Sequence, residues 1–351
     1  MTGVRSMRIG DRVVDDASDC FVIAEVGHNH QGDLDTAHRL LEAAAQAGVD
    51  AVKLQKRDNR NLFTSAFFDS PYVGPNSFGD TYGTHREHLE LDRAQYAELQ
   101  AHAAELGVLF FATAFDVPSA EFLANLDMPA YKIASGDLRN LPLIEHVARI
   151  GRPMFISTGG GEMDAVVRAH DTAREHNDDV CIMQCTAGYP PAWEELNLSV
   201  ITTYRERLPE TVIGFSSHDN GIAMATAGYA LGARAIEKHF TLDRTMRGTD
   251  HAFSLEPAGM RKLVRDLRRA RVAMGDGVKR AFASEVAPVI KMSKQLVAAR
   301  DLPDGHVVAA EDVLARSPGG GLTPDRLGEV VGRTLTAPLA ADEAFEVDRL
   351  R

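Results

Sequence analysis

The sequence predicts an α/β fold in which a (β/α)8 barrel is followed by a small β-rich domain. Three observations support this prediction: eight short apolar runs recur up to Thr241, amphipathic helix patterns separate them, and this rhythm ends near Ala283. Short, near-continuous apolar runs are typical of parallel strands that are buried on both faces. Eight such strand–helix units over about 250 residues have the length of a TIM barrel.

The predicted strands follow one another with helices between them. A doubly wound open sheet is the alternative arrangement, but no glycine-rich dinucleotide-binding fingerprint follows the first run, which disfavours it. The eight apolar runs are residues 21–27, 51–55, 109–115, 131–135, 154–159, 180–186, 212–218 and 235–241.

Helix signals fill the intervals between these runs. After the first run, apolar residues between positions 37 and 45 recur at the spacing of one helix face. Before the third run, Asp92 and Gln95 stand at the spacing of a capping box. After the eighth run, Pro257 opens a helix with a regular apolar face, and Gly275 ends it.

The pattern changes after the last barrel helix. The segment 284–293 contains Pro288 and few helix signals, so we expect a linker there. Beyond it, strand-like runs at 296–299 and 307–309 are interspersed with turn signals rich in proline and glycine. The predicted organisation is a barrel domain over residues 1–283, a linker over 284–293 and a β-rich domain over 294–351.

Composition disfavours several classes of function. The 351 residues include 38 Lys and Arg and 50 Asp and Glu, and the net charge of −12 disfavours binding to nucleic acid or to an anionic membrane. No apolar run approaches the ~18 residues of a transmembrane helix, and residues 1–16 lack the apolar core of a signal peptide. The sparse cysteines, Cys20, Cys181 and Cys185, fit a reducing compartment, so we expect a cytoplasmic protein.

Polar side chains end every predicted strand. In a (β/α)8 barrel, the carboxyl ends of the strands and the loops after them form the active-site face. So many polar groups would be costly in a barrel unless they meet one another or a ligand, so we predict one shared polar site. These residues are Glu25, Lys53, Thr113, Lys132, Ser135, Ser157, Thr158, Gln184, Thr186, Ser216, His218, Glu237, Lys238 and His239.

Two lysines stand inside apolar strands. Lys53 and Lys132 point either into the barrel mouth or into the surrounding helix layer, where a lysine would snorkel or form an ion pair. In the mouth they would bind a small, multiply charged anion: a carboxylate, a phosphate or both. The hydroxyls of Ser135 and Ser157 would add hydrogen bonds to a phosphate.

Two histidines end consecutive strands. At one rim, the imidazoles of His218 and His239 would bind a divalent transition metal and leave positions open for substrate. The alternative is a pair of histidines without a metal. The neighbouring strand ends carry Glu25 and Glu237, which favours the metal site.

A long segment in the second strand–helix unit, residues 56–88, is predicted to be a loop rich in aromatic residues. Long loops at this face often form a lid or a wall of the substrate site. A decorated surface loop is the alternative.

Several motifs stand in order along the chain, and the first is Ala24-Glu25-Val26-Gly27-His28-Asn29-His30-Gln31-Gly32. They resemble the motifs of the sialic acid (N-acetylneuraminate) synthase family. Residues 296–351 are similar to the antifreeze-like (SAF, β-clip) domain of that family. The resemblance covers essentially the whole chain and implies the same two-domain architecture. The other matching motifs are residues 53–55, 131–137, 185–190, 214–218, 237–241 and 248–251.

The resemblance implies a reaction. Members of the family condense phosphoenolpyruvate with an N-acetylated amino-sugar, usually N-acetylmannosamine, and release phosphate and a nine-carbon 2-keto sugar acid. The reaction implies a divalent metal, typically manganese, with magnesium or cobalt as alternatives. The resemblance also implies a domain-swapped homodimer, in which the C-terminal domain lies over the neighbouring barrel.

The family's functional residues carry over to matching positions of this chain. A metal on His218 and His239 would orient the sugar aldehyde. Glu25 and Glu237 would bind the sugar or move protons. The three implied catalytic residues are therefore Glu25, Glu237 and His239. The implied substrate-binding residues are Lys53, Asn76, Thr113, Lys132, Ser135, Ser157, Tyr189, Ser216, Asp250 and Arg316.

Some positions depart from the family pattern. Ala187 replaces a polar residue, and Gly160-Gly161 follow Ser157-Thr158-Gly159 where a methionine is usual. Ser317 stands where some members place an arginine that reaches the partner subunit's site. Either Arg316, one residue earlier, substitutes for it, or the contact is absent. These departures leave the acceptor sugar open, and relatives use sugars that give legionaminic or pseudaminic acid.

Two alternative functions remain. One is a phosphoenolpyruvate aldol synthase for another aldose, either free or phosphorylated. A phosphorylated aldose would need a second basic cluster at the mouth, and the sequence shows no clear one. The other is a catalytically silent sugar-binding protein. The presence of both histidines, both lysines and both glutamates disfavours it.

Overall fold

The computed structural model describes residues 5–351. The chain divides into two compact units, one that ends at Gly275 and one that runs from Asp276 to Arg351. Each unit has its own hydrophobic core. Among the described residues, no helix is long and apolar enough to cross a membrane.

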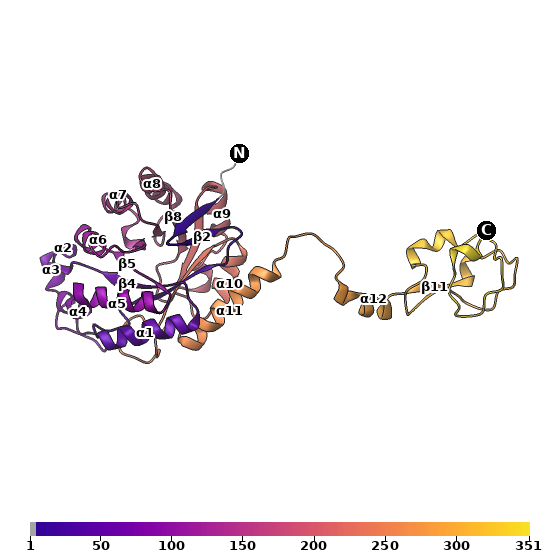
Figure 1. Cartoon of the computed structure of the whole chain (residues 1–351), viewed down its shortest axis with the longest axis horizontal. Coiled ribbons are helices and arrows are strands. Elements are labelled where there is room, and N and C mark those ends of the chain that lie inside the picture. The colour runs from indigo at the N-terminus through magenta and orange to yellow at the C-terminus, as the bar shows by residue number, and fades with distance from the viewer. Residues whose placement is uncertain (1–4) are drawn as a thin grey trace. The chain divides into compact units, whose positions relative to one another are not determined.

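Within residues 5–275, a closed barrel of eight parallel strands is surrounded by helices, so the predicted (β/α)8 barrel is confirmed (Figure 1). Strand β10 pairs with both β9 and β3, which closes the sheet and excludes the open-sheet alternative. Each predicted apolar run overlaps one strand. The barrel strands are β3 (Phe21–Gly27), β4 (Ala51–Lys56), β5 (Leu109–Ala114), β6 (Tyr131–Ile133), β7 (Met154–Ser157), β8 (Val180–Cys185), β9 (Val212–Ser217) and β10 (Ala235–His239).

Local signals set the helix ends. The Asp92 side chain accepts a hydrogen bond from the backbone N–H of Gln95 (2.9 Å), and the Gln95 side chain accepts one from that of Asp92 (2.8 Å), so the predicted capping box begins α5. Pro257 begins α11, as predicted. The helices around the barrel are α1 (Leu34–Ala47), α5 (Arg93–Glu105), α6 (Val117–Ala124), α7 (Leu141–Arg149), α8 (Met163–Arg174), α9 (Val200–Arg207), α10 (Ala223–Ala230) and α11 (Pro257–Ala273).

Alternation along the strands separates two sets of buried side chains. On β4, Val52 and Leu54 face the helices and join the large outer core, whereas Ala51 belongs to the cluster inside the barrel. Successive strand residues point to opposite faces, so Lys53 points into the barrel as Ala51 does. The inward-pointing residues are apolar at the amino ends of the strands and polar at their carboxyl ends.

A β-hairpin that the sequence analysis missed covers the amino end of the barrel. Strand β1 (Ser6–Ile9) pairs with β2 (Arg12–Asp15), and Met7, Ile9 and Val14 pack into the inner cluster. The alternation of Met7 and Ile9, followed by a Gly-Asp turn, is the signal that could have predicted it.

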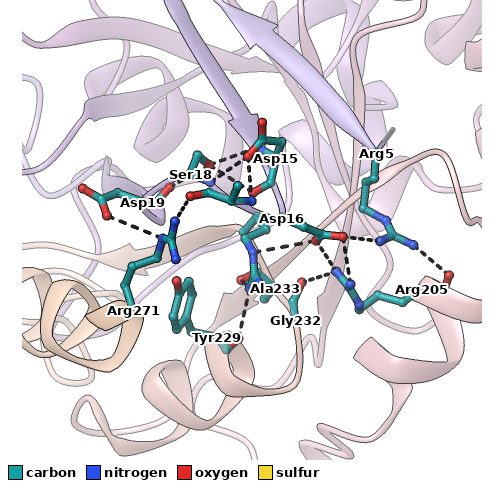
Figure 2. A network of polar contacts seen from close by, with 12 residues as sticks. Arg5, Asp15, Asp16, Ser18, Asp19, Arg205, Tyr229, Gly232, Ala233 and Arg271 are labelled. Carbon is teal, nitrogen blue, oxygen red and sulfur yellow. Dashed lines mark hydrogen bonds and ion pairs between the residues drawn. The ribbon is translucent and has the colours of Figure 1, made fainter. Parts of the chain in front are cut away.

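Ion pairs hold the chain after this hairpin against the barrel. Figure 2 shows the carboxylate of Asp16 between two arginines, with Arg5 Nη1 at 2.8 Å and Arg205 Nη1 at 2.7 Å. Arg5 also donates a hydrogen bond to the carbonyl of Thr211 (2.8 Å). These contacts tie the hairpin to α9 and to the start of β9.

The segment 56–88 was predicted to be a loop, but it folds into three short helices. An aromatic cluster holds it together: the ring centroid of Tyr82 lies 5.1 Å from that of Phe63, 4.6 Å from that of Phe67 and 5.4 Å from that of Tyr72. Burial of large rings stabilises a segment that has little regular structure. The helices are α2 (Asn59–Leu62), α3 (Ser65–Phe68) and α4 (Tyr82–His88).

The second unit contains the predicted β-rich domain. Strand β11 (Gln295–Ala298) matches the first predicted strand, but its antiparallel partner is β12 (Val313–Arg316), and 307–309 contributes only an isolated bridge at Val307. In the predicted linker, residues Val286–Met292 form the helix α12. Pro288 lies in the first turn of α12, where a helix tolerates proline, and this explains why it did not prevent helix formation.

Candidate active site

A cavity of about 490 Å³ opens at the carboxyl ends of the barrel strands. TIM barrels bind their substrates at this face, and the volume is typical of a small-molecule site. Every barrel strand, or the loop that follows it, contributes to the lining. The lining includes the predicted residues Glu25, Lys53, Thr113, Lys132, Ser135, Ser157, Tyr189, Ser216, His218, Glu237, His239 and Asp250.

Both lysines point into the barrel mouth, which resolves the alternative left by the sequence. The side chain of Lys53 is 2% exposed, and its Nζ lies 2.6 Å from Oε2 of Glu25 and donates to the Thr113 hydroxyl (2.7 Å). Lys132 Nζ donates to the Ser157 hydroxyl at 2.6 Å and lies 3.5 Å from Oε1 of Glu237. Two buried ammonium groups therefore lie in one cavity, where little water screens their charges.

The two glutamates lie in different electrostatic environments. Burial raises the pKa of Glu25 to about 7, although Lys53 opposes this shift. Burial also disfavours the charged form of Glu237, but Lys132 and Lys53 outweigh it and hold the pKa of Glu237 below its ordinary value. Glu25 is therefore the carboxyl group that binds a proton more readily, and Glu237 stays ionised. Such a divergence is typical of acid and base pairs.

The predicted histidine pair lies at the same mouth. The imidazole centroids of His218 and His239 are 5.2 Å apart, and the ring of Tyr189 lies 4.1 Å from that of His218. Asp250 Oδ2 is 3.8 Å from Nδ1 of His239. The two histidines predicted to bind a metal therefore lie next to Tyr189 and Asp250, which were predicted to bind the sugar.

The chemistry of this pair fits a divalent metal. Burial lowers the pKa of His218 to about 3 and that of His239 to about 4, so both imidazoles are neutral, the form that binds metals. His218 Nδ1 lies 3.0 Å from the carbonyl oxygen of Thr186, which holds the proton there and leaves Nε2 free. His239 Nδ1 has no hydrogen-bond partner in the described part of the chain.

A metal on this pair would have few protein ligands. Within residues 5–351, no group of three or more His, Cys, Asp and Glu side chains is arranged to hold a metal ion. Substrate and water would therefore complete the coordination of a metal on the two histidines, as in catalytic sites that keep positions open.

Two predicted residues do not line the cavity, and a third, Arg316, lies in the other unit, so its contact with a partner's site stays a prediction. Asn76 is not part of the cavity lining, and its side-chain oxygen accepts a hydrogen bond from the backbone of Gly248 (3.1 Å). Arg316 belongs to the second unit, where it forms an ion pair with Asp342. Lys238 was grouped with the strand-end polar residues, but its side chain faces the helix layer and pairs with Asp219 (3.1 Å).

The cavity also contains residues that the sequence analysis did not single out. Gln55 follows Lys53 on the inner face of β4, so strand alternation could have predicted its position. Its Nε2 donates to Glu25 Oε1 (2.7 Å). Arg57 and Arg86 line the cavity as well, and Arg86 comes from α4 in the inserted segment.

Comparisons with known proteins agree with the sequence motifs. The model of the NeuB family matches residues 40–279, and that of the SAF domain matches residues 294–351. N-acetylneuraminate-9-phosphate synthase of Homo sapiens is 39% identical over 328 residues, 93% of this chain and 91% of the relative. N,N'-diacetyllegionaminic acid synthase of Campylobacter jejuni is 33% identical over 326 residues, 92% of this chain and 97% of the relative.

A solved structure shows the same fold. The crystal structure of N-acetylneuraminic acid (sialic acid) synthetase from Leptospira borgpetersenii, in complex with citrate, superposes with a TM-score of 0.72. The two sequences are 30% identical, and the alignment covers 82% of this chain and 95% of that one.

Proposed function

The chain belongs to the NeuB family, and from this we propose that it condenses phosphoenolpyruvate with an N-acylated amino-sugar such as N-acetylmannosamine. The products would be a nine-carbon, sialic acid-like 2-keto sugar acid and inorganic phosphate. The names of two relatives, N-acetylneuraminate-9-phosphate synthase and N,N'-diacetyllegionaminic acid synthase, support this reaction class. The observation that carries the proposal is the convergence of Lys53 and Lys132 inside one cavity whose rim holds two neutral imidazoles.

The proposed reaction forms one carbon–carbon bond, and at C2 the oxygen of a water molecule replaces the oxygen that carries the phosphate. C3 of phosphoenolpyruvate attacks the aldehyde carbon of the open-chain sugar, and the aldehyde oxygen takes a proton. Water adds to the electron-poor C2 and loses a proton. The C2–O bond to phosphate then breaks and the electron pair leaves with the phosphate. The new C2 hydroxyl gives up its proton, to the phosphate or to a base, and C2 becomes the ketone.

The residues of the site can be given roles in this sequence. Lys53 and Lys132 bind the carboxylate and phosphate charges of phosphoenolpyruvate, with the hydroxyls of Thr113 and Ser157 orienting the two ammonium groups. Glu25 exchanges a proton with the reacting oxygen atoms, because its pKa lies near neutrality. Glu237 stays ionised and stabilises the positive charge that develops at C2.

We propose a divalent metal, manganese before magnesium or cobalt, on His218 and His239. When bound, it would supply Lewis-acid polarisation of the sugar aldehyde. The support is the neutral state of both imidazoles and the free Nε2 of His218.

The experiment that tests this function measures phosphate release from phosphoenolpyruvate by the purified full-length chain. Manganese-loaded protein is given N-acetylmannosamine, its 6-phosphate, a 2,4-diacetamido-trideoxyhexose or mannose, with and without a chelator. We expect release with an N-acyl sugar, none with mannose, and loss with the chelator. If folded, metal-loaded protein releases no phosphate with any N-acyl sugar, the proposal is wrong and a sugar-binding protein becomes the better interpretation.

We further propose that the protein is a cytoplasmic homodimer. Free, buried Cys20, Cys181 and Cys185 fit a reducing compartment. The helix α12 exposes four large apolar side chains in the single chain: Val286, Val289, Ile290 and Met292. An exposed apolar helix face of this kind is typical of a subunit interface.

Light scattering should therefore give twice the chain mass of 38.2 kDa. The double substitution Val289→Glu/Ile290→Glu should produce monomers, because it would bury two carboxylates in the interface. As a control, substitution of the exposed Glu311 by Gln should leave the dimer intact. A wild-type monomer at micromolar concentration would contradict the proposal.

A further inference from the structure

We propose that a second cavity, beside the active cavity and separate from it, binds an uncharged sugar. This cavity has a volume of about 340 Å³ and is lined by residues of α2, α4 and α6 and by the end of β4. None of the residues assigned to phosphoenolpyruvate, to the metal or to the acceptor lines it. The inference therefore goes beyond the proposed condensation and adds a binding site to the molecule.

Three polar atoms on residues that line this cavity are buried without a hydrogen-bond partner. Within residues 5–351, these atoms are Oδ1 of Asn59, Oγ of Ser119 and Oε1 of Glu90. Asn59 is only 5% exposed and Ser119 only 1%. Buried polar groups in folded proteins nearly always bond to protein, to ordered water or to a ligand, so three in one cavity point to a ligand site.

The three atoms define the hydrogen bonds that a ligand must make. The amide oxygen of Asn59 and the carboxylate oxygen of Glu90 can only accept, and the hydroxyl of Ser119 can accept or donate. The other carboxylate oxygen of Glu90 already accepts from Lys56 Nζ (2.8 Å). A ligand for this site must therefore donate at least two hydrogen bonds, as neighbouring hydroxyl groups do.

The charges around the cavity favour an uncharged ligand. Three cationic and three acidic side chains line it, so its formal charge is zero. Two of the cations are paired within it, Lys56 with Glu90 (2.8 Å) and Arg60 with Glu87 (3.1 Å). An ionised ligand would meet charges of its own sign and would have to compete with these ion pairs. The six side chains are Lys56, Arg57, Arg60, Asp58, Glu87 and Glu90.

The size and the apolar wall of the cavity favour a sugar over a bridging water. One water molecule occupies about 30 Å³ of liquid, roughly a tenth of this cavity, whereas cavities above about 300 Å³ are typical of small-molecule sites. Pro118 and Phe122 on α6 add an apolar surface to the polar one. A sugar ring carries C–H groups and several hydroxyls together, so it matches both surfaces.

The two unpartnered neutral side chains stand on elements that are tied together. Asp116 accepts hydrogen bonds from the backbone N–H of Asp58 (2.9 Å) and from that of Ser119 (2.7 Å). Asp58 directly precedes Asn59, the first residue of α2, and Ser119 lies in the first turn of α6. The donor positions of a ligand are therefore fixed before it binds, which lowers the entropy that binding costs.

One residue separates this cavity from the active cavity. Arg57 lines both. Its backbone N–H donates to Oε2 of Glu90 (3.3 Å), and its guanidinium group donates to Oε1 of Gln55 (2.7 Å), which lines the active cavity. Substitutions that test the second site must therefore leave Arg57 unchanged, and Asn59 and Ser119 meet this condition.

The test counts the molecules of radiolabelled N-acetylmannosamine that bind to the full-length, manganese-loaded chain in equilibrium dialysis. Wild type should bind one more sugar per chain than Asn59→Leu/Ser119→Ala does. Loss of two hydrogen bonds should weaken the second site by about 5- to 150-fold, and Asn59→Leu alone by about 2- to 13-fold. Asn61→Leu makes the same change at an exposed position of α2 and should bind as many sugars as wild type.

The outcomes separate this site from the proposed function. Phosphate release by Asn59→Leu/Ser119→Ala should stay within about 2-fold of wild type, which shows that the lost sugar is not the one in the active cavity. If the double variant binds as many sugars as wild type with the same affinity, the second site is wrong and its polar atoms bind water only, while the condensation stands.

If no sugar releases phosphate, the condensation fails, but wild type should still bind the one sugar that the double variant loses. A competition experiment tests the charge of the ligand. N-acetylneuraminate, which carries a carboxylate, should not displace this sugar, and equal competition would overturn the assignment to an uncharged ligand. Asn59→Leu, measured in the same way, provides the variant to use if the double variant does not fold.

Discussion

Replacing Lys132 with methionine is expected to reduce kcat/KM for phosphoenolpyruvate by about 10²–10³-fold, the loss typical when one preorganised charge-stabilising donor is removed. Methionine keeps much of the length and volume of the chain but removes the ammonium group, which lies 2.6 Å from Ser157 Oγ and 3.5 Å from Glu237. The substitution leaves Lys53 as the one lysine of the pair that can bind the carboxylate and phosphate charges of the substrate. It also removes one of the two ammonium groups that stabilise the ionised form of Glu237. Steady-state kinetics with varied phosphoenolpyruvate measures the effect.

A lysine on the surface gives the control for this experiment. Lys262→Met on the exposed face of α11 makes the same chemical change away from the cavity and should leave kcat/KM within about 2-fold. Circular dichroism on both variants establishes that the barrel is folded. If Lys132→Met keeps wild-type kinetics while folded, Lys132 does not bind phosphoenolpyruvate, and the assignment of the anion site to the lysine pair is wrong.

The barrel could be predicted because its strands are buried on both faces. Such strands must be apolar almost throughout, and even the three-residue β6 (Tyr131–Ile133) stood out as part of a longer apolar run. The hairpin β1–β2 was missed for the opposite reason. One face of it is exposed, so charged residues alternate with Met7, Ile9 and Val14 and hide its apolar face from a search for continuous runs.

The site could be predicted in part from the same alternation. Once Ala51 is inside the barrel, Lys53 and Gln55 must also point inward, and on β10 the same rule separates Glu237 and His239 from Lys238. Lys238 lies two residues after Ile236, which belongs to the outer core, so both side chains point to the same face of β10. The alternation rule would therefore have placed Lys238 against the helices.

Arg86 could not be predicted in this way. Its position depends on the packing of Tyr82 among Phe63, Phe67 and Tyr72 in the inserted segment, and no strand or helix period encodes such a tertiary contact.

Replacing Asp219 with alanine is expected to destabilise the barrel by about 3–5 kcal/mol, because it leaves the Lys238 ammonium buried without a counter-charge. Both side chains are 1% exposed, and Lys238 Nζ lies 3.1 Å from Asp219 Oδ1 and donates to the Ser217 hydroxyl at 3.1 Å. Burial already lowers the pKa of Lys238 against the opposing effect of Asp219. The melting temperature should fall by roughly 6–20 °C, as measured by calorimetry.

The partner variant distinguishes a lost ion pair from a cavity. In Asp219→Leu/Lys238→Met the buried charge is gone, and well-packed apolar replacements of a buried ion pair are often neutral, so most of the lost stability should return. Asp178→Asn removes a carboxylate that is 94% exposed and should change stability by less than about 0.5 kcal/mol. If the double variant is no more stable than Asp219→Ala, then packing around Asp219, and not the uncompensated charge of Lys238, determines the loss. On β10, Lys238 points outward and its neighbours Glu237 and His239 point into the barrel. The result therefore also shows whether the Asp219–Lys238 ion pair stabilises the strand that carries Glu237 and His239.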